Sequence, residues 1–350
     1  MKILQVGLGG FGRNHLRAWH EMGMGSDLYI ADLDIARHGD TKVFNLPADQ
    51  VATDFRTFLN DVDIVDIVTP STSHFQLCMA AFEAGKDVFV EKPMTMTSQE
   101  AHELAEVVNR TGRILQVGYY YRYHPISIDL HKSIRAGKLG GLRYLSGNFM
   151  GFKRARTDVG VTHTDGIHFI DLFNWLMESP PNQVFAVVRD HFDRGLEDFS
   201  VVLLQFPGGA TAKVESGYIQ PGRWQDKVVP NAYTSKEIFV CGAEATVEVD
   251  FETEFMNRHD VHQEFLNGTW TPVNKGNSTP NINTATPVQM IQAELTDFLG
   301  CVETRRRPSA DVVGSGIVLA RIMEAIYESG RNNAPVSLEW SESERAAFIR

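Results

Sequence analysis

The sequence predicts an α/β fold in two parts. The first is an N-terminal doubly wound parallel sheet, and the second is a C-terminal α+β domain with a large, mostly antiparallel open sheet. A glycine-rich turn directly follows the first apolar segment, Lys2 to Val6, and precedes a helical pattern. Strand and helix segments then alternate up to residue 122, which is typical of parallel sheets. From residue 123 onward strand segments follow one another and alternate apolar with polar residues, as antiparallel strands with one solvated face do.

Length and composition limit the classes of protein that this chain can be. Its 350 residues favour two domains, for which we expect the ranges 1–122 and 123–350. The net charge of −11 disfavours nucleic acid and anionic membranes as partners. No apolar run reaches the length of a membrane span, and the start of the chain lacks a signal-peptide core. The cysteines, Cys78, Cys241 and Cys301, are scattered without metal spacing, so we expect a reducing, cytoplasmic location.

The turn after the first strand matches the dinucleotide-binding pattern G-x-G-x-x-G in its proper setting, with a strand before it and a helix after it. Gly7 permits the tight turn, Gly9 lets the backbone approach a pyrophosphate, and Gly12 lets the helix and strand pack closely. The helix N-terminus offers N–H donors to the phosphates. The residues of this turn that we expect to bind the cofactor are Gly7, Gly9, Gly10, Phe11 and Gly12.

An acidic residue ends the second strand about twenty residues after the glycine turn. Asp32 can accept hydrogen bonds from a ribose 2′-hydroxyl, whereas a 2′-phosphate would meet a like charge there. Asp34 strengthens this preference and Arg37 softens it. The sequence therefore favours NAD over NADP.

A short buried strand, residues 87–90, stops on the charged pair Glu91-Lys92 and on Pro93. Its apolar, β-branched centre fits a strand that is covered on both faces. Because open α/β sheets bind ligands at the carboxyl ends of their strands, Lys92 is a candidate catalytic residue. The alternative is an exposed Lys–Glu pair at a strand end.

The remaining elements follow from periodicity, glycine stops and caps. Thr97 and Glu100 have capping-box spacing, and Gly85 and Gly112 suit helix ends. In the first part we expect strands at 28–31, 62–68, 87–90 and 114–118, and helices at 14–22, 54–60, 75–84 and 97–112. In the second part we expect strands at 142–149, 184–189, 199–206, 210–216, 237–241 and 246–250, helices at 126–136, 288–302 and 312–329, and a long polar loop at 267–287.

Several of these motifs together resemble one family. They are the GLGGFG turn, Thr69-Pro70 with His74, Ala84-Gly85-Lys86, Glu91-Lys92-Pro93, and Gly118-Tyr119-Tyr120-Tyr121-Arg122-Tyr123-His124-Pro125. In order and spacing they resemble the GFO/IDH/MocA oxidoreductases, named for glucose–fructose oxidoreductase and inositol dehydrogenase, and the likeness runs through most of the chain.

The resemblance implies roles for individual residues. It implies that Lys92 is the catalytic lysine and that Arg122 lies beside the cofactor. In the family, the peptide bond between this lysine and the following proline, here Lys92 and Pro93, is often cis. By analogy with the family we expect a homodimer or homotetramer. The residues that would line the nicotinamide side are Thr69, Pro70, His74 and Glu91.

A second polar cluster precedes a helix in the C-terminal part. The family usually has D-x-G-x-H here, and Gly166 and His168 match it, but Thr164 stands at the aspartate position and Asp165 follows one residue later. Either Asp165 serves after a backbone shift, or Thr164 holds substrate through its hydroxyl with His163 joining in. The alternative is that the polar run only caps the helix. His168 suits proton transfer because the ordinary pKa of histidine lies near working pH.

Two further groups of residues are candidates for contact with substrate. Lys153, Arg154 and Arg156 can hold a phosphate, a nucleotide-sugar diphosphate or a carboxylate, or can be a solvated strand edge. Tyr119 belongs to an aromatic stretch that offers ring faces to sugar CH groups.

Together these features predict hydride transfer between a secondary alcohol or ketone of a sugar, glycoside or polyol and nicotinamide C4. Lys92 would stabilise the developing alkoxide, and His168 would transfer the proton. We expect no metal, because no ligand cluster with metal spacing is visible. The alternatives are the same reaction on a nucleotide sugar or sugar phosphate, reduction of a non-sugar substrate such as an imine, and a nucleotide-sensing protein without catalysis.

Overall fold

The structure is a computed structural model that describes residues 1–349. Its described residues divide into two compact units, of which the first comprises residues 1–123 and 285–321 and the second comprises 124–284 and 322–349. The sequence prediction assigned all of 123–350 to one domain, whereas residues 285–321 pack with the first unit. Among the described residues, no helix has both the length and the apolar character that a membrane crossing requires.

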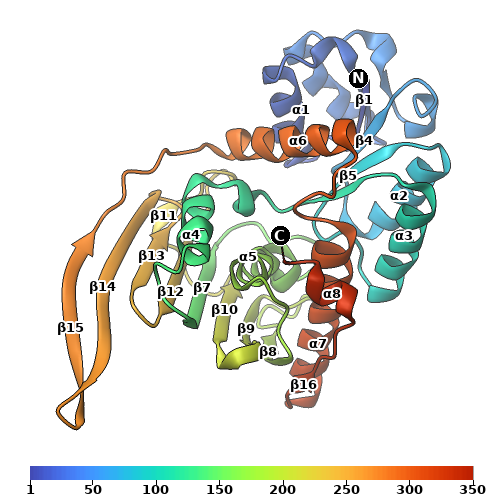
Figure 1. The fold of residues 1–350 in the computed structure, drawn as a ribbon. Helices are drawn as coiled ribbons and strands as arrows, with labels where there is room; N and C mark the ends of the chain where they lie inside the picture. The colour runs from blue at the N-terminus through green and yellow to red at the C-terminus, as the bar shows by residue number, and fades with distance from the viewer. Residues whose placement is uncertain (350) are drawn as a thin grey trace. The chain divides into compact units, whose positions relative to one another are not determined.

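The first unit is built on a six-stranded, all-parallel sheet in the order β3-β2-β1-β4-β5-β6 (Figure 1). The strand order reverses beside β1, and the carboxyl ends of β1 and β4 flank that point. In open α/β sheets this is where ligands bind. The strands are β1 (Ile3–Val6), β2 (Leu28–Ala31), β3 (Val51–Ala52), β4 (Ile64–Ile67), β5 (Asp87–Glu91) and β6 (Leu115–Gly118).

Helices from both ends of the chain cover this sheet. Trp19 on one helix and Phe298 on another are fully buried, and the Phe298 ring lies 5.7 Å from that of Phe89 on β5. The capping box at Thr97 and Glu100 is present as predicted. The helices are α1 (Gly12–Glu21), α2 (His74–Glu83), α3 (Ser98–Thr111) and α6 (Pro287–Thr304), followed by a π-helical turn η9 (Val312–Val318).

The second unit carries a ten-stranded sheet in the order β15-β14-β13-β12-β7-β10-β9-β8-β16, with β11 paired to β12 (Figure 1). All of its strand pairs are antiparallel except β7 with β10. The mostly antiparallel open sheet predicted from the sequence is therefore confirmed. Its strands are β7 (Leu142–Phe152), β8 (Gln183–Arg189), β9 (Phe199–Gln205), β10 (Thr211–Gly217), β11 (Trp224–Gln225), β12 (Tyr233–Gly242), β13 (Thr246–Asp250), β14 (Phe255–Leu266), β15 (Thr269–Ser278) and β16 (Val336–Ser337).

An apolar helix, α5 (Ile167–Met177), packs on the middle of this sheet. Gly147 on β7 makes the close approach possible, since a Cβ there would lie 2.7 Å from the Phe169 ring. A π-helical turn at Thr162–Gly166 leads into α5, so the polar cluster lies inside the helix and does not simply cap it. The other helices are α4 (Pro125–Arg135), α7 (Leu319–Asn332) and α8 (Glu342–Ala346).

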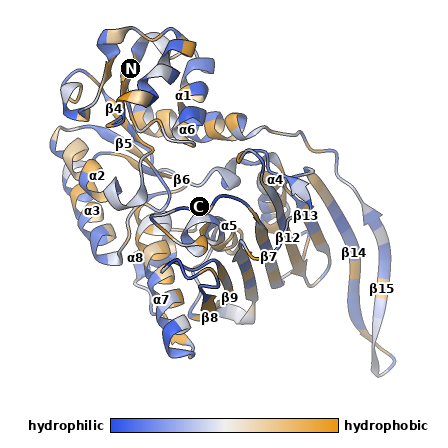
Figure 2. Ribbon diagram, turned by 180° about the vertical axis from the view of Figure 1, so that it is seen from behind, coloured by the Kyte–Doolittle hydropathy of each residue, from blue (hydrophilic) through white to orange (hydrophobic). Residues whose placement is uncertain are grey.

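The prediction of a loop at 267–287 is wrong over its first half, because Thr269–Ser278 forms β15 and pairs with β14. The two strands are joined at Asn267 and Gly268, both with positive φ, which is the geometry of a two-residue hairpin turn. Figure 2 shows mostly hydrophilic residues along this hairpin, so its strands lack the apolar alternation that reveals a strand in a sequence. The helix expected at 54–60 is only a short 3₁₀ turn, Phe55–Thr57.

Candidate functional site

The glycine turn follows β1 and is locked by close backbone contacts. Gly7 has φ +106°, and a Cβ there would lie 2.5 Å from the Val68 carbonyl oxygen. A Cβ at Gly12 would lie 2.3 Å from the carbonyl oxygen of Gly7. The fully buried Gln5 amide donates to the carbonyls of Gly7 and Gly12, at 2.9 and 2.8 Å. At these positions only glycine fits the turn.

The middle of the turn is open. A Cβ at Gly9 would meet only Arg37 Nη1 at 3.9 Å, and one at Gly10 would meet nothing within 4 Å. Helix α1 begins here with no side-chain cap and no acidic residue in its first turn. Uncapped N–H groups beside open space suit a pyrophosphate, so these residues fit a dinucleotide such as NAD.

Asp32 lies just beyond β2 and is tied to the glycine turn. Its carboxylate accepts hydrogen bonds from the backbone N–H of Leu8 at 2.6 Å and of Asp34 at 2.8 Å. Arg37 Nη1 lies 3.6 Å from it. Asp32 is nearly buried. Its hydrogen bonds fix the turn, and its carboxylate also places a negative charge at the end of β2.

Hydrogen bonds of His74 connect the segments that follow β4 and β5. The two ring nitrogens of His74 lie 2.8 Å from the carbonyl oxygen of Pro93 and 3.0 Å from that of Thr69. His74 thereby links the turn after β4 with the loop after β5. Lys92 is half-buried at the end of β5, and its peptide bond to Pro93 is cis.

Beneath Lys92 lies a buried charged network. His15 Nδ1 is 3.0 Å from Asp66 and its Nε2 is 3.3 Å from Glu91, while the indole of Trp19 donates to Asp66. Burial alone would lower the pKa of His15, but the charges and hydrogen bonds of Asp66 and Glu91 raise it to about 10. His15 is therefore a cation between two carboxylates.

Two other predicted residues of the first unit are buried. The Arg122 guanidinium donates to the carbonyl of Ser309 at 2.7 Å and is 4% exposed. Tyr119 is 1% exposed. Within this unit Arg122 ties the segment that follows β6 to Ser309, and Tyr119 is part of the buried interior.

The polar cluster of the second unit contains an ion pair. Lys153 Nζ lies 2.6 Å from Asp165 Oδ1, and both side chains are nearly buried. The ammonium also lies 4.8 Å from the centre of the Phe149 ring and 5.9 Å from that of Tyr218. His168 is buried and its ring stacks on Phe149. The structure thus brings Asp165 and His168 to the same patch.

Three further candidates of this unit have partners of their own. His163 Nδ1 lies 2.8 Å from the Tyr327 hydroxyl, which donates to Glu197. The hydroxyl of Thr164 donates to the carbonyl of Gly160, one helical turn back. Arg156 makes a two-point ion pair with Asp158 through its Nε and Nη2.

Sequence reasoning missed several residues that form these networks. The signal for Gln5 and Asp66 was a polar residue inside an otherwise apolar strand. For His15 it was a histidine three residues after the last glycine of the turn. No local signal pointed to Glu294 on α6, whose carboxylate lies in the same cluster as His15.

A six-stranded doubly wound sheet with this glycine turn defines a dinucleotide-binding protein of the Rossmann class. The model of the oxidoreductase family with an NAD-binding Rossmann fold matches residues 1–119, and the GFO/IDH/MocA C-terminal domain matches residues 128–248. The chain belongs to the GFO/IDH/MocA family of oxidoreductases. This confirms the predicted family and fold class. It also confirms the prediction that the protein is a nicotinamide-dependent oxidoreductase that acts on CH–OH groups.

Relatives are similar over different parts of the chain. D-apiose dehydrogenase of Paraburkholderia graminis is 26% identical over 98% of this chain and 91% of its own length. The scyllo-inositol 2-dehydrogenase (NAD(+)) of Bacillus subtilis is 31% identical over 46% of this chain, which is 50% of that protein. A structure of levoglucosan dehydrogenase in complex with NADH superposes with a TM-score of 0.80 at 19% identity, over 97% of this chain and 100% of the other.

Proposed function

We propose that the protein transfers hydride between a secondary alcohol or ketone of a sugar, glycoside or polyol and NAD. The observation that carries the proposal is Lys92 at the end of β5, on the same sheet edge as an open glycine turn. The relatives just described, two of them at least a quarter identical to this chain, bear the names of sugar and polyol dehydrogenases. Bound NAD would supply the hydride acceptor, and every other step falls to side chains.

In the oxidation direction the substrate hydroxyl loses its proton as the hydride leaves the carbinol carbon. The proposal gives Lys92 the task of stabilising the developing alkoxide with its ammonium group. His168 would accept the proton, because imidazole titrates near neutral pH. Asp165 would orient substrate or His168, with Lys153 holding its carboxylate in place.

The substrate we favour carries no phosphate. The basic residues near the second-unit cluster are already paired within the chain, Lys153 with Asp165 and Arg156 with Asp158. An anionic substrate would have to compete with both carboxylates. A nucleotide sugar or sugar phosphate remains the second candidate, supported by the exposed Arg154 beside them.

The test is a screen of NAD⁺ reduction over free sugars, inositols and UDP-sugars, followed by variants. Lys92→Ala should lower kcat by at least about 100-fold while NAD⁺ binding, followed calorimetrically, stays largely intact. Lys42→Ala, an exposed lysine of the same unit, is the matched control. Near-normal turnover by Lys92→Ala would refute the assignment. Tight NAD⁺ binding without turnover on any substrate would favour the nucleotide-sensing alternative.

NAD is the cofactor that we propose over NADP. The carboxylates of Asp32 and Asp34 after β2 would repel a 2′-phosphate, and Arg37 is already engaged by both, at 3.6 and 3.2 Å. Kinetics with the two cofactors test this choice directly.

We also propose that copies of this chain associate through the sheet of the second unit. A separate proposal is that the protein works in a reducing compartment such as the cytoplasm. Helix α5 packs on one face of the sheet, while Tyr144 and Leu203, each 37% exposed, belong to the strands β7 and β9. All three cysteines are free thiols. Sedimentation equilibrium of the wild type and of Leu203→Asp would show a smaller species for the variant, and an unchanged monomer for both would refute the association.

A further inference from the structure

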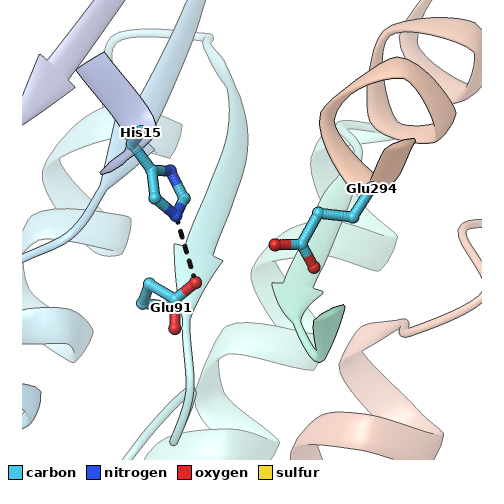
Figure 3. Close-up of side chains that lie close together, drawn as sticks. All are labelled: His15, Glu91 and Glu294. Carbon is cyan, nitrogen blue, oxygen red and sulfur yellow. Dashed lines mark hydrogen bonds and ion pairs between the residues drawn. The ribbon is translucent and has the colours of Figure 1, made fainter. Parts of the chain in front are cut away.

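Three buried side chains from distant parts of the sequence meet beneath the end of β5 (Figure 3). His15 comes from α1, Glu91 is the last residue of β5, and Glu294 comes from α6. Their ligand-type atoms all lie within 4.8 Å of one another. His15 and Glu294 are 0% exposed and Glu91 is 6% exposed. Figure 3 shows the carboxylate of Glu294 directed toward the other two side chains.

His15 has hydrogen-bond partners that account for a charge, whereas the carboxylate of Glu294 has none among the described residues. His15 has a carboxylate at each ring nitrogen, Asp66 at 3.0 Å and Glu91 at 3.3 Å. In contrast, neither carboxylate oxygen of Glu294 has a hydrogen-bond partner among residues 1–349. A buried carboxylate without donors is strongly disfavoured and takes up a proton instead.

The charges around Glu294 point the same way. The titratable groups that face it are His15 from α1, Asp66 from β4, Glu91 from β5, Tyr123 after β6 and Asp297 on its own helix. Three of these are carboxylic acids and only one is a base, while burial raises the pKa of Tyr123 well above its ordinary value, so that its hydroxyl adds no charge. Burial raises the pKa of Glu294 well above its ordinary value, and repulsion from Glu91 raises it further, while His15 opposes both.

We propose that Glu294 is an uncharged carboxylic acid in the folded protein, and that its proton holds Glu91 in place at the strand end that carries Lys92. The O–H of Glu294 would donate toward Glu91 directly or through one water molecule, a spacing that 4.8 Å permits. Glu91 then keeps its contacts with His15, at 3.3 Å, and with the backbone N–H of Lys92, at 3.2 Å. Glu294 is in this way a positioning residue, and its link to turnover rests on the role proposed for Lys92.

A proton explains the cluster better than a metal ion does. A histidine must be neutral to bind a metal, whereas the carboxylates at both ring nitrogens of His15 favour its charged form. The Nε2 of His15 is already directed at Glu91. The site also offers three side-chain ligands that are almost completely shielded from solvent, so a hydrated ion would lack an entry path.

The direct test is NMR of wild-type protein labelled with ¹³C at the glutamate side-chain carboxyl. At pH 8 we expect one glutamate resonance at the position of a protonated acid, and we expect it to be absent from Glu294→Gln. Glu303→Gln, an exposed glutamate near the end of the same helix, should retain the resonance. If every glutamate of the wild type titrates as a carboxylate below pH 6, the proposal is wrong.

The pH dependence of stability gives a second test that does not depend on turnover. Above pH 4.5 the unfolded chain gives up the Glu294 proton, but the folded protein keeps it. The unfolding equilibrium constant of the wild type should therefore rise with pH, by up to about tenfold per unit more than that of Glu294→Gln. Parallel pH profiles would overturn the proposal. One bound divalent ion per chain, lost in Glu294→Gln, would also overturn it in favour of a metal site.

These results separate the two proposals. A protonated Glu294 together with an active Lys92→Ala variant would leave the acid in place and remove its link to catalysis. If both proposals hold, Glu294→Gln should shift the alkaline limb of the profile of kcat against pH, because Glu91 would no longer be held in place beside Lys92. Glu303→Gln should leave that profile unchanged.

Discussion

The crowded Gly12 and the open Gly9 should respond to the same substitution in opposite ways. A Cβ at Gly12 would lie 2.3 Å from the Gly7 oxygen, about 1 Å closer than the 3.4 Å at which ordinary contact begins. Relieving that overlap requires α1 to move off β1, at a cost of roughly 1–3 kcal/mol. For a unit of this size we expect Gly12→Ala to lower Tm by roughly 2–12 °C.

Gly9→Ala should instead fold normally and lose cofactor. Its Cβ would meet only Arg37 Nη1 at 3.9 Å, so Tm should stay unchanged. The new methyl group would occupy the space by which a pyrophosphate approaches the backbone. We expect Kd for NAD⁺ to rise at least about tenfold, which is about 1.4 kcal/mol.

Differential scanning fluorimetry and isothermal titration calorimetry measure the two effects on the same samples. Gly39→Ala is the control, because its Cβ would meet nothing within 4 Å and it lies outside the turn. Wild-type affinity in Gly9→Ala would show that the pyrophosphate does not cross this turn. An unchanged Tm in Gly12→Ala would refute the close-packing argument.

Three other substitutions test the charges of the two units. Asp32→Ala removes a carboxylate that would repel a 2′-phosphate, so the ratio of kcat/KM for NAD⁺ over NADP⁺ should fall about tenfold, or about 1.4 kcal/mol. An unchanged ratio would count against the NAD assignment. Asp165→Asn leaves the Lys153 ammonium buried and unpaired and should lower the free energy of unfolding by about 3–5 kcal/mol in denaturant titrations. Lys153→Met combined with it should recover most of that loss, and a fully stable single variant would contradict the argument. Finally, the His15 proton stabilises the fold fully below pH 6.5, and this stability is lost as pH rises toward 10, the raised pKa of His15. His15→Gln should remove that part of the decline between pH 6.5 and 10, and an identical decline in both proteins would refute it.

Local signals in the sequence predicted the parts of the fold that depend on neighbouring residues. The glycine turn, the Thr97–Glu100 capping box and the αL glycine at 112 each depend on a few adjacent positions, and all are present. The hairpin at Asn267 and Gly268 also had a local signal, the Asn-Gly pair, which the polar composition of its strands obscured.

The candidate site was predicted less completely because its partners are far apart along the chain. Glu91 and Glu294 are separated by about 200 residues and belong to a cluster that no spacing rule reveals. Lys153 was noted as a member of a basic cluster, but its pairing with Asp165 depends on how β7 and the π-helical turn meet. Such contacts are set by the sheet topology, which single-sequence patterns do not specify.

The first unit is assembled from two separated stretches of chain, and this has a consequence for biosynthesis. Trp19 and Phe89 emerge from the ribosome early, yet Leu295 and Phe298, which complete the same core, follow about 200 residues later. At about 5–20 residues per second that interval lasts roughly 10–40 s. During this time the apolar face of the nascent nucleotide-binding sheet lacks its final helix, so it is a natural substrate for a chaperone. A chain that terminates after residue 123 would keep that face exposed permanently and should aggregate.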